Sequence, residues 1–320
     1  MTTATAAPAK RKKRRWTKWL FRAVVTIIVL LVVLIYGVAP YLMSRYVLTA
    51  AVTRPMDRAL TDTPGSLGAS YRDVEFTTPD GVKISGWLLE SRGRDATIIY
   101  SHGLFRSRRE LLQRAVDLWR LGYGALLYDA RNHGQSGHSI TSLGYNERLD
   151  VEGAIRYLQN EVRSSGRIVL LGVSMGAAAD LLAAAEEPSV SAVISDSSFL
   201  TFKDTVSHHV GRFLRLPSFP LANEFDYFIS HRAGFDADAL SPLEAVKNLG
   251  DRPVMFIAGA HDPRMPPAIA EQLYRASQSP KSEVLVVDGP DSNRHGHSYF
   301  VDPHLYISRV SQFLESSLAR

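Results

Sequence analysis

The chain has 320 residues, enough for one large domain and an appendage, and 45% of them are hydrophobic, as in a globular protein with a sizeable core. It has no cysteine, which excludes disulfides, thiolate metal sites and a cysteine nucleophile. The formal net charge of +5 arises near the N-terminus: subtracting the eight basic residues of positions 10–22 from +5 leaves −3 for the remainder. These eight are Lys10, Arg11, Lys12, Lys13, Arg14, Arg15, Lys18 and Arg22.

Residues 1–22 form a basic arm, a feature that by itself is also found in nucleic-acid-binding proteins. The next segment favours a membrane instead. Residues 23–44 contain no charged residue, and the next one is Arg45. As a helix that rises about 1.5 Å per residue, this segment would span the roughly 30 Å core of a bilayer. Aromatic residues suited to membrane interfaces lie near both ends: Trp16, Trp19, Tyr36 and Tyr41. We expect membrane attachment through this helix and no nucleic-acid partner.

The alternative interpretation of residues 23–44 is a cleaved signal peptide. The apolar run is long for that role, and Pro40 follows the small-residue site Val38-Ala39, which is a poor cleavage context. An uncleaved anchor is therefore favoured, with residues 45–70 as a linker containing several Pro and Gly residues. Because basic flanks stay cytoplasmic, the chain is expected to be a single-pass protein of the cell membrane, with its N-terminus cytoplasmic and its C-terminal domain extracytoplasmic.

Beyond the linker, strand-like and helix-like segments alternate. Strand-like segments at 71–77 and 82–90 flank a hairpin turn, Pro79-Asp80-Gly81. Further strands are expected at 97–100, 125–128, 168–171, 192–194, 254–258 and 284–287, and helices at 107–121, 147–163, 175–186, 267–277 and 303–318. This alternation predicts an α/β fold with a mostly parallel sheet covered by helices on both faces.

An aromatic-rich segment at about 199–250 interrupts this alternation. It is too long for a simple crossover between strands, so we expect a small helical cap over the carboxyl edge of the sheet. Its aromatic residues either pack the cap onto the body or line a pocket.

The sequence Gly172-Val173-Ser174-Met175-Gly176 lies between an expected strand and an expected helix. A G-x-S-x-G sequence in that setting predicts a nucleophile elbow, because flanking glycines leave backbone room for a turn that lifts the serine hydroxyl clear of the sheet. The alternative is an ordinary turn. Ser174 is the predicted nucleophile.

A serine hydroxyl is a poor nucleophile at neutral pH and needs a base that a third group orients. Asp262 follows the expected strand 254–258, where the carboxyl ends of strands carry catalytic loops, and is the predicted acid; a turn or N-cap aspartate is the alternative. Two histidines follow the last strand, His295 and His297, and only one of them need be the base.

The developing oxyanion of an acyl-transfer reaction needs donors. The amide of Met175, directly after the serine, is one candidate, and the amide of Leu104 in the loop after strand 97–100 is the second. Gly103 would give that loop its turn, and His102 is expected to be structural. The sequence contains neither H-E-x-x-H nor H-x-x-E-H, so no metal and no cofactor are expected.

In chain order, these motifs resemble the α/β-hydrolase superfamily from about residue 71 to the C-terminus, and most closely its membrane-tethered Bem46-like and serine aminopeptidase S33-like branch. The matching motifs are His102-Gly103, the loop 129–136, the elbow 172–176, the loop 259–262 and His295. The resemblance implies an eight-stranded α/β-hydrolase domain over 71–320. It supports Asp262 as the acid, favours His295 over His297, and gives Asp129 and Arg131 a role in bracing their loop. Asn132 departs from the pattern, which commonly has glycine there.

The expected activity is that of a serine hydrolase, of carboxylesterase or lipase type, cleaving an ester, thioester or amide through an acyl-enzyme. A small-molecule or lipid-like acyl substrate is expected. An S33-type peptidase is an alternative, as is a binding protein that kept the fold without activity. Dehalogenases and epoxide hydrolases of this fold use a carboxylate at the elbow, where this chain has Ser174. The oligomeric state is left open.

Overall fold

The computed structural model describes residues 10–49, 61–162 and 166–319. Eight strands form one sheet: β1 (Arg72–Thr77), β2 (Lys83–Leu89), β3 (Ala96–Ser101), β4 (Gly124–Tyr128), β5 (Arg167–Val173), β6 (Val190–Asp196), β7 (Val254–Gly259) and β8 (Glu283–Val287). Their order across the sheet is β1-β2-β4-β3-β5-β6-β7-β8. β2 runs antiparallel to both of its neighbours and the other pairs are parallel, so the predicted mostly parallel sheet is confirmed.

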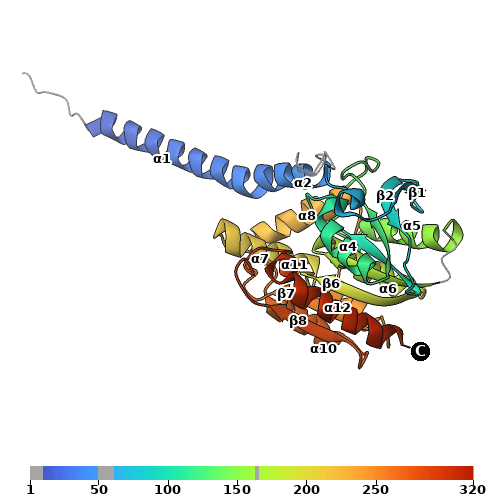
Figure 1. The fold of residues 1–320 in the computed structure, drawn as a ribbon. Helices are drawn as coiled ribbons and strands as arrows, with labels where there is room; N and C mark the ends of the chain where they lie inside the picture. Colours follow the sequence, from blue (N-terminus) through green and yellow to red (C-terminus); the bar gives the residue numbers. More distant parts are fainter. Residues whose placement is uncertain (1–9, 50–60, 163–165, 320) are drawn as a thin grey trace, which may run out of the picture.

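The helices of the body and cap follow in chain order (Figure 1). They are α4 (Leu112–Arg120), α5 (Glu147–Asn160), α6 (Met175–Glu186), α7 (Phe202–His209), α8 (Leu221–Ala233), α9 (Pro242–Lys247), α10 (Pro267–Ala276), α11 (Ser298–Val301) and α12 (Pro303–Leu318). The expected helix 107–121 begins instead with a separate 3₁₀ turn, η3 (Arg108–Leu111), where Asp129 accepts hydrogen bonds from both the amide and the guanidinium of Arg108.

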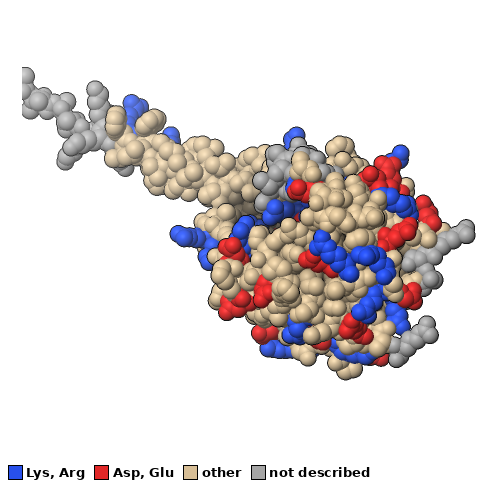
Figure 2. Space-filling model, viewed as in Figure 1, with Lys and Arg blue, Asp and Glu red and all other residues tan. Residues whose placement is uncertain are grey.

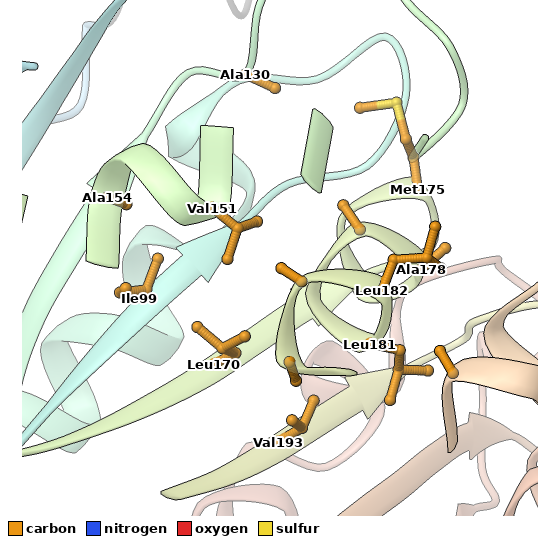
Figure 3. Close-up of a cluster of buried hydrophobic side chains, with 14 of the residues drawn as sticks. Ile99, Ala130, Val151, Ala154, Leu170, Met175, Ala178, Leu181, Leu182 and Val193 are labelled. Carbon is orange, nitrogen blue, oxygen red and sulfur yellow. The ribbon is translucent and has the colours of Figure 1, made fainter. Parts of the chain in front are cut away.

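Alternate residues of each central strand point to opposite faces of the sheet, and each face has its own buried core. Leu170 of β5 lies on the face covered by α5, α6 and α10, together with Ile99 and Val193 from the neighbouring strands (Figure 3). Val169 and Leu171 lie on the face covered by α4 and α12. Strands buried on both faces explain why the sequence shows continuous apolar runs there.

The cap forms between β6 and β7, within the expected segment 199–250, and consists of α7, a π-helical turn η4 (Val210–Leu214), α8 and α9. Thr201 is the N-cap of α7, and its side chain accepts a hydrogen bond from the Asp204 amide. The cap is tied to the body near the carboxyl end of β7, where His208 donates a hydrogen bond of 2.8 Å to the Pro263 carbonyl.

A long N-terminal helix projects from the body (Figure 1). It comprises α1 (Lys10–Val33), a π-helical turn η1 (Leu34–Val38) and α2 (Ala39–Thr49). The π turn precedes Pro40, which cannot donate to the carbonyl four residues earlier, and the Ala39 amide bonds to Leu34 five residues back. By length and composition, 15–49 could cross a membrane.

The expected linker 45–70 differs from the structure at both ends. Residues 45–49 continue the helix, because Leu48 is fully buried and its carbonyl accepts a hydrogen bond from the Thr141 amide. Near the other end, Pro64–Leu67 form a 3₁₀ turn, η2, whose Leu67 carbonyl accepts a hydrogen bond from Arg120. Residues 50–60 lie outside the described part of the chain.

Candidate active site

Ser174 lies in a sharp turn between β5 and α6, with φ of 54° and ψ of −115°, a region that non-glycine residues rarely occupy. The flanking glycines allow this turn. A Cβ on Gly172 would lie 2.5 Å from the Ala177 nitrogen, and one on Gly176 would lie 2.1 Å from the Ser101 carbonyl oxygen. The elbow therefore depends on glycine at both positions, as the sequence motif indicates.

The structure brings Ser174, His295 and Asp262 into one hydrogen-bonded chain. The Ser174 hydroxyl donates to Nε2 of His295 at 2.7 Å, and Nδ1 of His295 donates to Oδ2 of Asp262 at 2.7 Å. These residues come from loops after β5, β8 and β7, three strands whose carboxyl ends lie on the same edge of the sheet. Asp262 is buried, and its Oδ1 also accepts from the amides of Arg264 and Met265. These bonds hold the carboxylate in a single orientation.

His297 lies outside this chain of hydrogen bonds. It precedes α11, and its ring packs against Phe300 with centroids 5.3 Å apart. Burial lowers the pKa of His297, and the positive charge of the nearby Arg294 lowers it further. The structure thus shows which of the two histidines contacts Ser174, a question that the residues alone left open.

The amides expected to bind an oxyanion lie beside the elbow. Met175 is the first residue of α6, where backbone N–H groups have no partner within the helix. Leu104 follows Gly103, and a Cβ on Gly103 would be 3.5 Å from that of Ser174, so this loop lies directly against the nucleophile. The Gly103 amide itself donates to Glu110 at 2.7 Å.

Glu110 is a site residue that sequence reasoning missed. Besides the Gly103 amide, its carboxylate pairs with Arg106 at 3.4 Å, and burial raises its pKa. It braces the loop that carries Leu104. A glutamate at the start of an expected helix resembles an ordinary first-turn acid, so the sequence contains no signal for this contact.

A second missed group lies beneath the triad. The backbone carbonyl of Asp196 accepts a hydrogen bond from the Ser174 amide at 2.9 Å, and its buried carboxylate accepts from Ser298 at 3.0 Å. Arg114, which is fully buried, donates to the Gly296 carbonyl at 2.8 Å and lies 3.8 Å from the Asp196 carboxylate. This cluster connects the nucleophile turn to the loop that carries the histidine.

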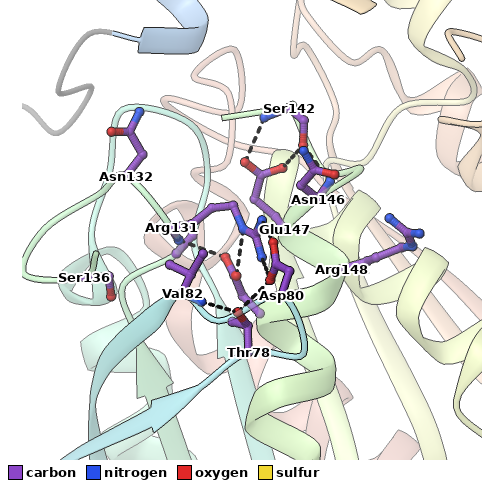
Figure 4. Close-up of polar contacts among 12 residues, drawn as sticks. Thr78, Asp80, Val82, Arg131, Asn132, Ser136, Ser142, Asn146, Glu147 and Arg148 are labelled. Atoms are coloured by element: carbon purple, nitrogen blue, oxygen red, sulfur yellow. Dashed lines mark hydrogen bonds and ion pairs between the residues drawn. The ribbon is translucent and has the colours of Figure 1, made fainter. Parts of the chain in front are cut away.

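The loop after β4 is held by charged side chains, as expected from the resemblance. Asp129 accepts from Arg108 at 2.8 Å and from the Gln135 amide at 2.9 Å. Arg131 forms bidentate contacts with Asp80 (Figure 4). It also donates a hydrogen bond to Asp150. These contacts fasten the loop to the β1–β2 hairpin turn and to α5.

Asn132 has a φ of 62° at the position where the family resemblance led us to expect glycine. Asparagine is among the residues that tolerate this left-handed conformation, so the substitution keeps the turn. Its side chain donates to Thr141 at 3.1 Å. Asparagine in place of glycine therefore does not alter the backbone conformation of the loop after β4.

His102 is buried and has a structural role. Its Nδ1 donates to the Gly103 carbonyl at 2.8 Å, and its Nε2 accepts from the Ala130 amide at 3.0 Å. Burial lowers its pKa to about 3, so the ring stays neutral. Among the residues that the structure describes, no group of three or more His, Asp or Glu side chains is arranged to hold a metal ion.

A hydroxyl, an imidazole and a buried carboxylate in this order can activate the hydroxyl as a nucleophile, because the imidazole takes its proton and the carboxylate stabilises the resulting imidazolium. Backbone amides at the start of α6 can stabilise negative charge on the attacked group. The geometry is suited to acyl transfer.

Several known proteins are similar to this chain. A family model described as serine aminopeptidase, S33 matches residues 92–225. YqkD of Bacillus subtilis, an uncharacterized protein, is 32% identical over 263 residues, which cover 80% of this chain and 85% of YqkD. Protein bem46 of Schizosaccharomyces pombe is 25% identical over 231 residues, 69% of this chain and 70% of bem46.

Among solved structures, the Pyrococcus furiosus esterase Pf2001 is similar, with a TM-score of 0.67 and 29% identity over 80% of this chain and 94% of the esterase. This chain and the esterase share one fold, in agreement with the strand order and the helices on both faces of the sheet. The chain belongs to the α/β-hydrolase superfamily, in the branch of the Bem46-like and serine aminopeptidase S33-like proteins.

Proposed function

We propose that this chain is a membrane-anchored serine hydrolase that cleaves an ester, thioester or amide through an acyl-enzyme. The observation that carries the proposal is the chain of two 2.7 Å hydrogen bonds from Ser174 through His295 to Asp262. The strained backbone at Ser174 supports it, since strain of this kind is common at functional sites.

In the proposed mechanism, His295 takes the hydroxyl proton as Ser174 attacks the substrate carbonyl carbon. Asp262 keeps the Nδ1 proton of His295 in place and stabilises the charged ring. The amides of Leu104 and Met175 donate to the oxyanion of the tetrahedral intermediate. His295 then protonates the leaving group, and the acyl group remains on Ser174. Water, deprotonated by His295, attacks the acyl-enzyme and releases the acid with the Ser174 hydroxyl restored.

The nucleophile is tested with a fluorophosphonate probe on the full chain. We expect wild-type protein to be labelled and Ser174→Ala to be unlabelled. Ser195→Ala, a buried serine on the neighbouring strand β6, is the matched control and should label normally. Labelling of Ser174→Ala would remove Ser174 from the mechanism, and a folded wild-type protein that neither labels nor turns over esters would favour a binding protein without activity.

The base is tested by the same probe on two alanine variants. His295→Ala should slow labelling by about 10³-fold or more, because the serine loses its proton acceptor. His297→Ala should label within a few-fold of wild type, since its ring packs on Phe300 rather than on Ser174. The reverse order would assign the base to His297.

Membrane anchoring is proposed on three features of the N-terminal helix. It contains an apolar segment long enough to span a bilayer, its apolar side chains are exposed, and its basic residues lie at one end. We expect the full chain to stay in the membrane fraction after alkaline carbonate extraction. A chain that starts at residue 61 should be released if it folds.

The proposed orientation places the N-terminus in the cytoplasm and the hydrolase domain outside, because the basic arm favours the cytoplasmic side. Because the chain has no cysteine, single-cysteine variants report orientation directly. A membrane-impermeant maleimide should label Arg275→Cys, an exposed position of α10, in intact cells. Labelling only after lysis would place the domain in the cytoplasm.

A lipophilic carboxylic ester is the proposed substrate class. The similar solved protein is named an esterase, whereas the matching family model is named for an aminopeptidase, so both reactions are worth assaying. We expect turnover of p-nitrophenyl esters that rises from short to medium acyl chains, and little hydrolysis of aminoacyl p-nitroanilides. Faster turnover of the anilides would identify a peptidase.

A further inference from the structure

The cap exposes an apolar edge, which we define as residues 210–219, running through η4 to the start of α8. Four of its large apolar side chains are exposed: Phe213, Leu214, Leu216 and Phe219, the last by 76%. An exposed apolar cluster of this kind usually contacts another surface. Arg212 and Arg215 lie on the same edge, and the chain from 205 to 223 contains no acidic residue.

This edge is adjacent to the N-terminal helix. Tyr36 of η1 packs against a small buried cluster at the base of the edge, made by Val210, Leu221, Ala222 and Phe225. Further along the helix, Tyr41 contacts Phe228 of α8 edge-to-face at 5.9 Å. In Figure 1 the end of the cap where α7 runs into η4 points to the same side of the body as α1.

The position of these contacts along the helix sets the depth of the cap. The last basic residue of the arm is Arg22, and Tyr36 lies fourteen positions later in the sequence, about 21 Å along a helix that rises 1.5 Å per residue. A bilayer core is about 30 Å thick. If Arg22 lies at the cytoplasmic boundary, the cap meets the helix before the helix has left the hydrocarbon core, and any tilt of the helix places the contact deeper.

A polar surface would be costly at that depth, because its groups would lose water without gaining partners. The edge instead presents aromatic and aliphatic side chains with two arginines, a composition typical of interfacial segments that contact anionic headgroups. Figure 2 shows the projecting helix as a largely uncharged surface and the acidic side chains on the body.

We propose that the cap edge 210–219 is inserted in the outer leaflet of the membrane that the N-terminal helix crosses. This inference rests on the proposed anchor. The edge also reaches the active site: Phe213 packs against His209, and the Arg264 guanidinium lies 6.0 Å from the Phe213 ring. Arg264 donates its amide hydrogen to the Asp262 carboxylate, so the edge lies beside the loop that carries the triad acid. An acyl chain lying in that leaflet is the substrate that this placement suits.

The test measures lipid contact at single residues of the full chain. Because the chain has no cysteine, the variant Phe219→Cys can be labelled at that position alone with the fluorophore NBD. The labelled protein is reconstituted in vesicles whose lipids carry a doxyl quencher on the acyl chain. Tyr274→Cys, an exposed aromatic position of α10 away from the cap, is the matched negative control. Leu30→Cys in α1 reports the anchor itself. Fluorophosphonate labelling of Ser174 checks that each variant is folded.

We expect doxyl lipid to quench NBD at 219 and at 30 several-fold more than NBD at 274. If position 30 is quenched while 219 behaves like 274, the cap does not enter the leaflet and the inference is wrong, but the anchor stands. If position 30 is not quenched, the anchor is wrong and the inference falls with it. Neither outcome changes the assignment of Ser174, which the probe tests separately.

Discussion

Arg114 of α4 donates a hydrogen bond of 2.8 Å to the carbonyl of Gly296, 182 residues away in the chain and next to His295. The guanidinium has no exposed surface and lies 5.5 and 5.3 Å from the ring centroids of Tyr299 and Tyr306. It holds the histidine loop against α4, while Asp196 beside it accepts from the Ser174 amide. One buried cation therefore supports two of the three loops that meet at the site.

Arg114→Leu should destabilise the protein strongly. It leaves the Asp196 carboxylate buried without its cation, which typically costs about 3–5 kcal/mol. The double variant Arg114→Leu/Asp196→Asn should recover part of this loss, because no lone charge remains. Denaturant midpoints of the detergent-solubilised full chain measure both effects. Equal midpoints for wild type and Arg114→Leu would show that the pair contributes nothing.

Gly176→Ala should abolish probe labelling and lower stability. Its Cβ would lie 2.1 Å from the Ser101 carbonyl, so β3 and the elbow would have to separate. Overpacking of this kind costs about 1–3 kcal/mol or more. Gly211→Ala is the matched control, because the nearest atom to its Cβ would be the Ser218 hydroxyl at 3.6 Å, an ordinary contact. Normal labelling of Gly176→Ala would mean that the elbow tolerates a side chain there.

Asn132 offers a test of the left-handed turn by a pair of substitutions. Asn132→Gly and Asn132→Ala both lose the bond to Thr141, but only alanine places a Cβ at a φ of 62°. We expect the alanine variant to be less stable than the glycine variant by about 1 kcal/mol. Thermal melts of the two variants under one buffer condition give the difference. Alanine at least as stable as glycine would argue against strain at this position.

His102 should make stability depend on pH. Burial lowers its folded pKa from 6.5 to about 3, so between these values the unfolded chain binds more protons than the folded one. Its contribution is therefore complete above about pH 6.5 and decreases as the pH falls toward 3, by up to about 1.4 kcal/mol per pH unit.

His102→Gln removes this titration. The variant should be less stable than wild type at pH 7.5, because the bonds to Gly103 and Ala130 are disturbed, but its stability should fall less steeply between pH 6.5 and 4.5. Urea unfolding at several pH values measures both slopes. Parallel curves for the two proteins would mean that His102 is not held neutral by the fold.

The anchor-like helix, the alternating strands and the elbow were predictable because each depends on neighbouring residues. The elbow is an example, because it is built from one contiguous stretch: strand 167–173, the glycines at 172 and 176, and the small residues of α6. Local patterns of this kind also predicted the sheet and the cap. The extension of the N-terminal helix to Thr49 was missed, because that helix is lengthened by burial of Leu48 against the body, a contact made across the chain.

By itself, the sequence determined which residue types were available in which order: a serine on a glycine-flanked turn, then an acid after one strand, then two histidines after the last. The family resemblance favoured His295 over His297, but the contact between His295 and Ser174 is seen only in the tertiary structure, where Arg114 donates a hydrogen bond to the same loop at Gly296. The tertiary structure also revealed the contacts by which Glu110, Arg114 and Asp196 support the loops of the site. Their partners are distant in sequence, and a buried charge acquires its role from the groups that folding brings around it.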